Sequence, residues 1–209
     1  MTRVENIKNR EATLADLEVI VDLHFTSFTA REHIAIYLGR DFIRTMYHWF
    51  IDSPRTVTIV AEDQGRIIGF HTGCNGPYFR LMFTENKVAS LKAVVLHPWV
   101  ICFPAIIKRL FSAFFTENHQ LQKLTTDKSF MNFGFIAIHP SYRQKNLGVA
   151  LVDGLAEECR KKGWHNFYLI TYKRNKVAAL TLESSGGWKQ EPLDRDRILW
   201  TKRLEPSHF

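Results

Sequence analysis

Apolar and polar positions along the chain follow two rhythms, one typical of helices and the other of strands. Apolar residues recur at helical spacing from Leu14 to Phe25 and from about Gly39 to Ile51, so we expect a helix in each stretch. Thr13 precedes the first stretch and Asp16 follows three residues later, which is the capping-box arrangement of a helix start. The polar residues and proline at 52–54 should end the second helix.

Strand-like runs occupy much of the remaining chain. A short strand is expected at 7–12, and the runs 56–61 and 66–72 flank a turn at Asp63, Gln64 and Gly65, which predicts a hairpin. Further strands are expected at 131–138, 166–171 and 197–202, with helices after the first two. A hairpin requires antiparallel pairing and a strand-helix-strand unit requires parallel pairing, so the fold class is α/β with a mixed, mostly antiparallel sheet.

Residues 75–129 interrupt this rhythm. A structureless loop of that length would be unusual, so we expect helices there, including an amphipathic helix around Lys87 to Leu96, lying over one face of the sheet. The interpretation is a single domain at 1–209 with a helical insertion at about 75–129. Within the insertion, the apolar stretch from Trp99 to Phe115 leaves several roles open: core, a wall of an acceptor site, a peripheral membrane contact or a homodimer contact.

Composition narrows the class of protein. The chain has 209 residues, with 28 Lys and Arg against 21 Asp and Glu, which gives a net charge of +7. Three widely spaced cysteines form neither a disulfide framework nor a metal motif. The longest uncharged apolar segment, 93–107, has about 15 residues where a membrane span needs ~20, and two prolines interrupt it. With no apolar core in residues 1–11 for a secretory signal, a cytoplasmic protein without a transmembrane segment is expected.

The window from Phe135 to Asp153 carries the clearest chemical signal. A strand ends at Pro140, and a basic loop with Arg143 and Lys145 then leads into a helix whose first turn contains Gly148. Such a loop presents backbone amides and the positive end of a helix dipole, so a pyrophosphate fits it. The positive net charge is explained by attraction of an anionic ligand, and since no nucleic-acid-binding motif accompanies it, nucleic acid is not expected as a partner.

This window resembles the acetyl-CoA signature of the Gcn5-related N-acetyltransferase (GNAT) superfamily. The signature is roughly Arg/Gln-x-x-Gly-x-Gly/Ala, and here it is Arg143-x-x-Asn146-x-Gly148. Asn175 to Ala178, with Gly187 and Trp188 downstream, resembles the second motif of the family. The resemblance covers most of the chain apart from the insertion. It implies a GNAT fold with splayed parallel strands, helices on both faces of the sheet, and acetyl-CoA as co-substrate.

The resemblance also assigns roles to individual positions. The main chain of Ile136, Ala137 and Ile138 would pair with the pantetheine arm beside a bulged strand. Backbone amides from Gln144 to Val149 would wrap the pyrophosphate, and Asn175 would contact the pantetheine or phosphate region. The cofactor-binding residues implied are Ile136, Ala137, Ile138, Arg143, Gln144, Lys145, Asn146, Leu147, Gly148, Val149 and Asn175.

Two departures from the family pattern affect the chemistry. Asn146 replaces the first glycine of the signature, although asparagine tolerates a left-handed turn. Leu182 stands where many family members have a tyrosine that protonates the departing thiolate, and an added glycine precedes Trp188. The catalytic candidates are therefore His71 as the general base and Tyr172 as the general acid, with Glu183 as a weaker acid candidate.

These observations predict an acyl-CoA-dependent N-acyltransferase that acts by direct transfer. The acceptor would be the primary amine of a small molecule. Helical insertions of this kind resemble those of superfamily members encoded with surface-polysaccharide genes, which implies an amino sugar. Two alternatives stay open, namely a catalytically impaired cofactor-binding or assembly protein, and an acetyltransferase of a protein or tRNA amine. The sequence predicts no metal site.

Overall fold

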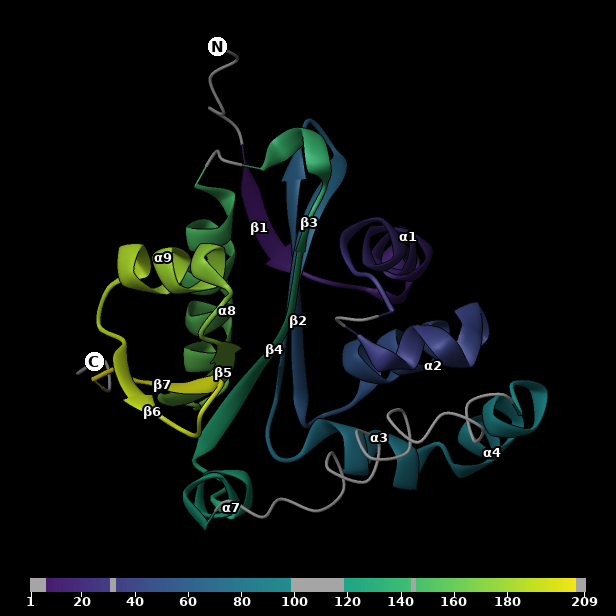
Figure 1. Ribbon diagram of the computed structural model, residues 1–209. Helices are drawn as coiled ribbons and strands as arrows, with labels where there is room; N and C mark the ends of the chain where they lie inside the picture. The colour runs from purple at the N-terminus through teal and green to yellow at the C-terminus, as the bar shows by residue number, and fades with distance from the viewer. Residues whose placement is uncertain (1–6, 31–32, 99–118, 144–145, 206–209) are drawn as a thin grey trace.

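The computed structural model describes residues 7–30, 33–98, 119–143 and 146–205 (Figure 1). Within them the strands hydrogen-bond into one seven-stranded sheet in the order β1-β2-β3-β4-β5-β7-β6. The strands are β1 (Lys8–Glu11), β2 (Thr56–Asp63), β3 (Arg66–Cys74), β4 (Phe130–Ile138), β5 (Asn166–Tyr172), β6 (Lys189–Pro192) and β7 (Arg197–Arg203). Only β4 and β5 pair in parallel, so the predicted mixed, mostly antiparallel sheet is confirmed.

Helices cover both faces of the sheet (Figure 1). On one face lie α1 (Leu17–Ser27) and α2 (Gly39–Asp52), and on the other lie α8 (Leu147–Lys161) and α9 (Lys176–Ser185). Short 3-10 turns at Leu14–Asp16, Ile34–Leu38 and Pro140–Tyr142 lead into three of these segments. The side chain of Asp16 accepts hydrogen bonds from the backbone N–H and the hydroxyl of Thr13, as the capping-box pattern predicts.

Two layers of apolar side chains hold the helices to the sheet. Ile20, Ile43 and Phe70 belong to the cluster between α1, α2 and the sheet, whereas Ile59 and Leu155 belong to the cluster between the sheet and α8. Successive residues of a strand point to opposite faces, so a strand in the middle of this sandwich must be apolar on both sides. This explains why the run 56–61 is uninterrupted by charge.

The insertion after β3 is helical in its described parts, as expected. It contains α3 (Tyr78–Glu85), α4 (Lys87–Leu96) and α7 (His119–Thr126), and α4 has the bounds that the amphipathic pattern predicts. The Trp99 to Phe115 stretch lies outside the described residues. No helix within the described residues is both long and apolar enough to cross a membrane.

The sequence pattern missed β6. Its four residues are all exposed, and it pairs with β7 alone at the edge of the sheet, so it has no buried face to produce an apolar alternation. An element held by main-chain hydrogen bonds alone leaves little trace in the order of polar and apolar residues.

The two parallel strands separate soon after they meet. Pairing runs from Phe130 opposite Asn166 to Asn132 opposite Tyr168 and then stops, while β4 continues to Ile138 and β5 to Tyr172. Beyond Asn132, one edge of β4 pairs with β3, and the other has no strand partner among the described residues. The splayed parallel strands implied by the family resemblance are therefore present.

A β-bulge changes the direction of β4 at the start of this split. His71 pairs with Ile136 and Gly73 with Phe133, so Gly134 and Phe135 together oppose the single residue Thr72. The hydroxyl of Thr72 accepts a hydrogen bond of 2.9 Å from the Phe135 N–H. A Cβ on Gly134 would lie 2.9 Å from that hydroxyl oxygen, which explains the glycine at this position.

Candidate active site

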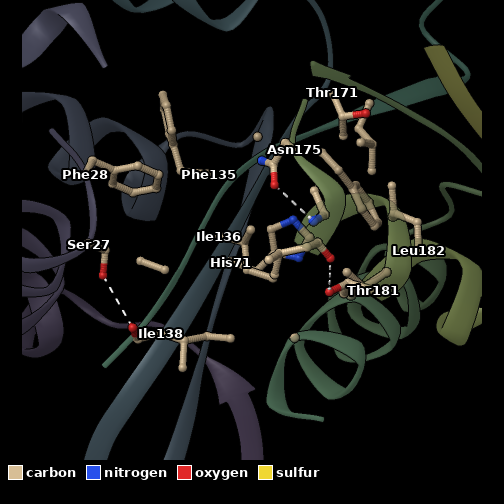
Figure 2. A pocket seen from close by; sticks show the side chains of 18 of the residues that line it. Ser27, Phe28, His71, Phe135, Ile136, Ile138, Thr171, Asn175, Thr181 and Leu182 are labelled. Carbon is tan, nitrogen blue, oxygen red and sulfur yellow. Dashed lines mark hydrogen bonds between the residues drawn. The ribbon is translucent and has the colours of Figure 1, made fainter. Parts of the chain in front are cut away.

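A pocket of about 380 Å³ occupies the split between β4 and β5 (Figure 2). Its walls come from both faces of the sheet: Ser27 at the end of α1 and the following residue Phe28 on one side, and residues of α8 and α9 on the other. The remaining lining comes mainly from the parting strands, namely Phe133 to Ile138 of β4 and Leu169 to Tyr172 of β5. The Ser27 hydroxyl donates to the Ile138 carbonyl at 3.5 Å, joining α1 to the end of β4 (Figure 2).

The predicted main-chain segment Ile136 to Ile138 lines this pocket. Its residues pair with β3 through His71, Phe70 and Gly69 on one edge, so the opposite edge is the one that faces the split. An extended ligand in the split could therefore hydrogen-bond to β4 as an added strand does. The side chain of Ala137 is buried toward α1 and α2 and adds nothing to that edge.

The N-terminus of α8 also opens onto the pocket. Asn146 adopts a left-handed conformation (φ +54°), as the substituted glycine position requires, and its side chain makes no capping hydrogen bond within the described residues. The first backbone N–H groups of a helix have no intrahelical acceptor, so this end is suited to an anion. Gly148 lines the pocket, while the side chain of Leu147 is buried in the core and Val149 is half-buried.

Gly148 is at a close approach between two helices. A Cβ there would lie 3.1 Å from Cγ2 and 3.3 Å from Oγ1 of Thr181 on α9, so a larger residue would occupy space between α8 and α9. Arg143 lines the same end of the pocket, and its Nε donates to the Ile138 carbonyl at 3.4 Å. Gln144 and Lys145 lie outside the described residues.

Asn175 lies at the pocket wall, directly before α9, as its N-cap residue. Its Oδ1 accepts a hydrogen bond from the Ala178 N–H at 3.1 Å, so it caps the helix (Figure 2). This leaves the Nδ2 group of Asn175 as the donor that it can offer to a ligand. The capping role and the predicted ligand contact are therefore compatible.

His71 lies in the pocket on the α8 side of the sheet. The residue is 2% exposed, its ring packs edge-on against Phe133, and Nδ1 is 3.3 Å from the Leu151 carbonyl oxygen. A carbonyl only accepts, so Nδ1 carries the proton and Nε2 of the neutral ring carries a lone pair. Burial lowers the pKa of His71 to about 4, which keeps the ring neutral at pH 7.

Tyr172 and Leu182 mark the other wall. Tyr172 ends β5, is 48% exposed and lines the pocket, with the Arg174 guanidinium 5.0 Å from the centre of its ring. Leu182, at the position where the family pattern has a tyrosine, is buried and also lines the pocket. Glu183 is exposed and is not among the lining residues.

A buried polar chain backs the α1 side of the pocket, and sequence reasoning did not find it. The Tyr47 hydroxyl is 2.7 Å from His24 Nδ1, and His24 Nε2 is 2.9 Å from His33 Nδ1. The His33 ring lies 4.4 Å from the ring of Phe135, a pocket residue. Burial lowers the pKa of His24 to about 4 and of His33 to about 3, and raises that of Tyr47.

The sequence contains only one signal for this hydrogen-bonded series of Tyr47, His24 and His33. His24 falls on the apolar face of the first helix, where a buried polar side chain must find a partner. Its partners Tyr47 and His33 could not be read from spacing, because they lie 23 and 9 residues away in the chain. Among the described residues, no group of three or more histidines, cysteines, aspartates or glutamates is arranged to hold a metal ion.

The comparison with known protein families agrees with the geometry of the pocket. Residues 112–186, which span α7, β4, α8, β5 and α9, match the model of the acetyltransferase (GNAT) family. This segment is therefore similar in sequence to the GNAT family, and the described residues adopt the GNAT fold. The GNAT family uses acetyl-CoA, and the features of this pocket fit that co-substrate: a strand edge for an extended arm, a helix N-terminus for phosphates and a nearby arginine. No curated protein matches the chain in sequence.

Solved structures with the same fold are distant in sequence. The PaiA N-acetyltransferase from Thermoplasma acidophilum, in complex with coenzyme A, is 13% identical with a TM-score of 0.59, over 95% of this chain and 99% of that one. A GNAT acetyltransferase from Streptococcus pneumoniae is 16% identical with a TM-score of 0.55, over 96% and 100%. The ribosomal-protein-S18-alanine N-acetyltransferase from Escherichia coli is 12% identical with a TM-score of 0.52, over 98% and 99%. Resemblance at this level concerns the GNAT fold.

Proposed function

We propose that this GNAT domain transfers the acetyl group of acetyl-CoA directly to the primary amine of a small molecule, with an amino sugar as the leading acceptor class. The observation that carries the proposal is a pocket in the β4–β5 split that receives lining from both faces of the sheet. An acetyl donor and an acceptor can meet in such a pocket without a covalent enzyme intermediate. Its volume of about 380 Å³ suits a small molecule.

In this proposal His71 is the general base. Its Nδ1–H is held by the Leu151 carbonyl, so Nε2 is the atom that accepts the proton of the attacking amine. A carbon–nitrogen bond forms to the acetyl group as the carbon–sulfur bond breaks. Tyr172 donates its hydroxyl proton to the departing thiolate, and the Leu182 position contributes only packing.

We assign donor binding to the residues that the family resemblance indicated. The free edge of Ile136 to Ile138 would pair with the extended arm, the start of α8 at Asn146 to Val149 would hold phosphate oxygens, and Arg143 and Asn175 would add donors. The free and buried thiols of Cys74 and Cys159 suit a reducing, cytoplasmic compartment.

Two measurements test the proposal. Calorimetric titration with acetyl-CoA should show binding, and release of the free thiol should follow when amino sugars, other small amines and peptides are offered in turn. Turnover with a small amine supports the proposal. Binding of acetyl-CoA with turnover only on peptides would assign a protein acceptor, as in the named function of the S18-alanine relative. Binding without turnover on any acceptor would favour the catalytically impaired alternative.

A further inference from the structure

Helix α4 is packed with its small residues inward and its large aliphatic residues outward. Ser90 and Ala93 are buried, whereas Val88, Leu91, Val95 and Leu96 are 83%, 67%, 67% and 54% exposed. Ten large apolar side chains are exposed among the described residues, and these four lie within nine consecutive positions. Single exposed aliphatic residues are ordinary, but a helix face made of them needs an explanation.

Three of the exposed residues form a continuous stripe. At 100° per residue, Val88, Leu91 and Val95 fall within an arc of about 60°, whereas Leu96 lies about 80° from Val88, beyond Lys92. Lys87 borders the stripe on one side and Lys92 on the other. Neither lysine forms an ion pair with any residue that the structure describes, and α4 contains no acidic residue.

The surroundings of α4 leave this stripe facing outward. The helix packs on α2, α3 and the turn at Ile34–Leu38, at the periphery of the molecule (Figure 1). The acidic residues near α4 lie away from its outer face. Glu85 accepts a hydrogen bond from the Trp49 indole and lies near Arg55. Asp41 lines a hollow between α2 and α4 that Lys92 also borders. The outer face is thus apolar along its centre and positive along its edges.

A second copy of this chain is a poor match for such a face. Two copies joined by α4 about a twofold axis would bring four lysines together around one apolar contact, with no acid on the helix to offset them. A bilayer surface with anionic headgroups matches both features, because aliphatic side chains enter the acyl boundary while lysine stems extend to the phosphates.

We infer that α4 is a docking surface for anionic membranes. The stripe of Val88, Leu91 and Val95 enters the bilayer, with Leu96 beside it, while Lys87 and Lys92 contact lipid phosphates. The domain lies on the bilayer through this helix and does not cross it. This inference is independent of the acetyl-transfer activity, and a failure of either leaves the other unaffected.

Vesicle co-sedimentation of the full chain tests the docking surface. The protein should bind vesicles of phosphatidylcholine and phosphatidylglycerol, and bind phosphatidylcholine vesicles more weakly. The variant Val88→Ser/Leu91→Gln/Val95→Ser should lower the partition coefficient at least about tenfold, because it removes the inserted side chains. The variant Lys87→Glu/Lys92→Glu should lower it more than about tenfold on the anionic vesicles alone, since each basic residue near such a surface contributes roughly fivefold. About 1 M salt should reproduce that loss.

Matched controls separate this surface from general properties of the protein. Val19→Ser/Leu180→Gln removes exposed aliphatic residues from α1 and α9, and Lys128→Glu/Lys189→Glu removes the same charge elsewhere; both should bind vesicles as the wild type does. Equal binding by the α4 variants and the wild type overturns the inference. A clearly lower melting temperature of the aliphatic α4 variant also overturns it, because the face is then covered within the folded chain. So does a wild-type dimer that this variant converts to monomer.

Discussion

The Nδ1 atom of His71 lies 3.3 Å from the carbonyl oxygen of Leu151, which ties the middle of β3 to the first turns of α8. This contact determines the tautomer of a buried ring, because only the nitrogen that carries a proton can donate to a carbonyl. Nε2 is then the basic atom that His71 offers in the pocket. The role proposed for His71 therefore depends on a main-chain atom that is 80 residues away in sequence.

Replacing His71 with asparagine should separate the base from the structural contact. The Asn side chain retains a donor for the Leu151 carbonyl but lacks Nε2, so we expect kcat to fall by about 10²–10⁴-fold with the acetyl-CoA affinity unchanged. Because burial lowers the pKa of His71 to about 4, kcat/KM should show no histidine limb between pH 7 and 5 in the wild type. Steady-state kinetics and calorimetry measure both effects. His48→Asn on the exposed side of α2 is the control, and an unchanged kcat in His71→Asn would remove this residue from the mechanism.

Tyr172→Phe tests the general acid. The substitution keeps the ring and its contact with the Arg174 guanidinium and removes only the hydroxyl. We expect kcat to decrease by about 10²-fold or more with an unchanged KM for acetyl-CoA, since protonation of the thiolate occurs after binding. Thiol-release kinetics provide the measurement, with Tyr37→Phe, also on an exposed ring, as the control. Wild-type turnover in Tyr172→Phe would reassign the acid.

Arg143 is expected to act on donor affinity. It lines the pocket close to the start of α8, and its side chain is exposed, so its interaction with a phosphate is partly screened by solvent. Arg143→Gln should raise the dissociation constant of acetyl-CoA about 3–10-fold, and the difference should shrink in high salt. Arg195→Gln, in the turn between β6 and β7, provides a neutralised arginine outside the pocket for comparison. Equal affinities of the two variants would argue against phosphate binding at this loop.

Gly148→Val tests the close approach of α8 and α9. The added side chain would meet Thr181 at 3.1–3.3 Å, so we expect a loss of about 1–3 kcal/mol in unfolding free energy and at least tenfold weaker acetyl-CoA binding. Adding Thr181→Ala to Gly148→Val removes the obstructing atoms and should restore part of both losses. Denaturant titration and calorimetry follow the two quantities. Full acetyl-CoA affinity in Gly148→Val would contradict the assigned site.

Three buried histidines should make the fold sensitive to acid. His24, His33 and His71 have folded pKa values of about 4, 3 and 4, against 6.5 without burial, so the unfolded chain binds more protons between these limits. Stability is therefore full above about pH 6.5 and is lost as the pH falls towards 4, by roughly 1–2 kcal/mol per histidine at pH 5. Chemical denaturation at pH 7 and pH 5 measures this loss. His33→Gln should reduce the loss, whereas the exposed His48→Gln should not, and a pH-independent stability would show that the three rings are solvated.

The sequence predicted the elements that have a buried face. The helical spacing from Leu14 onward and the hairpin around Gly65 correspond to observed elements, because each places most of its apolar side chains in the core. The stretch starting at Lys87 is also a helix, but it exposes its large aliphatic side chains. The same reasoning could not predict β6, because all four of its residues are exposed. The Asn146-x-Gly148 pattern was visible because a left-handed turn and a close helix contact restrict which residues fit.

Much of the site depends on contacts that sequence spacing does not encode. The bulge at Gly134 arises from the Thr72 hydroxyl on the neighbouring strand, and the Tyr47–His24–His33 chain joins α1 and α2 to the residue that precedes the Ile34–Leu38 turn. A solvated histidine has a pKa near 6.5, but burial between the sheet and α8 lowers the pKa of His71 to about 4. That environment exists only once the chain has folded.

The short pairing between β4 and β5 also has a mechanical consequence. Four strands lie on one side of it and three on the other, and only three residue pairs, from Phe130–Asn166 to Asn132–Tyr168, join the two groups by main-chain hydrogen bonds. The two halves of the sheet are thus joined to each other over only a short length of strand. The angle between the two halves depends on the side chains packed between them, including Phe133, Leu169 and Leu182. The packing of a few apolar groups therefore determines the width of the pocket in the split.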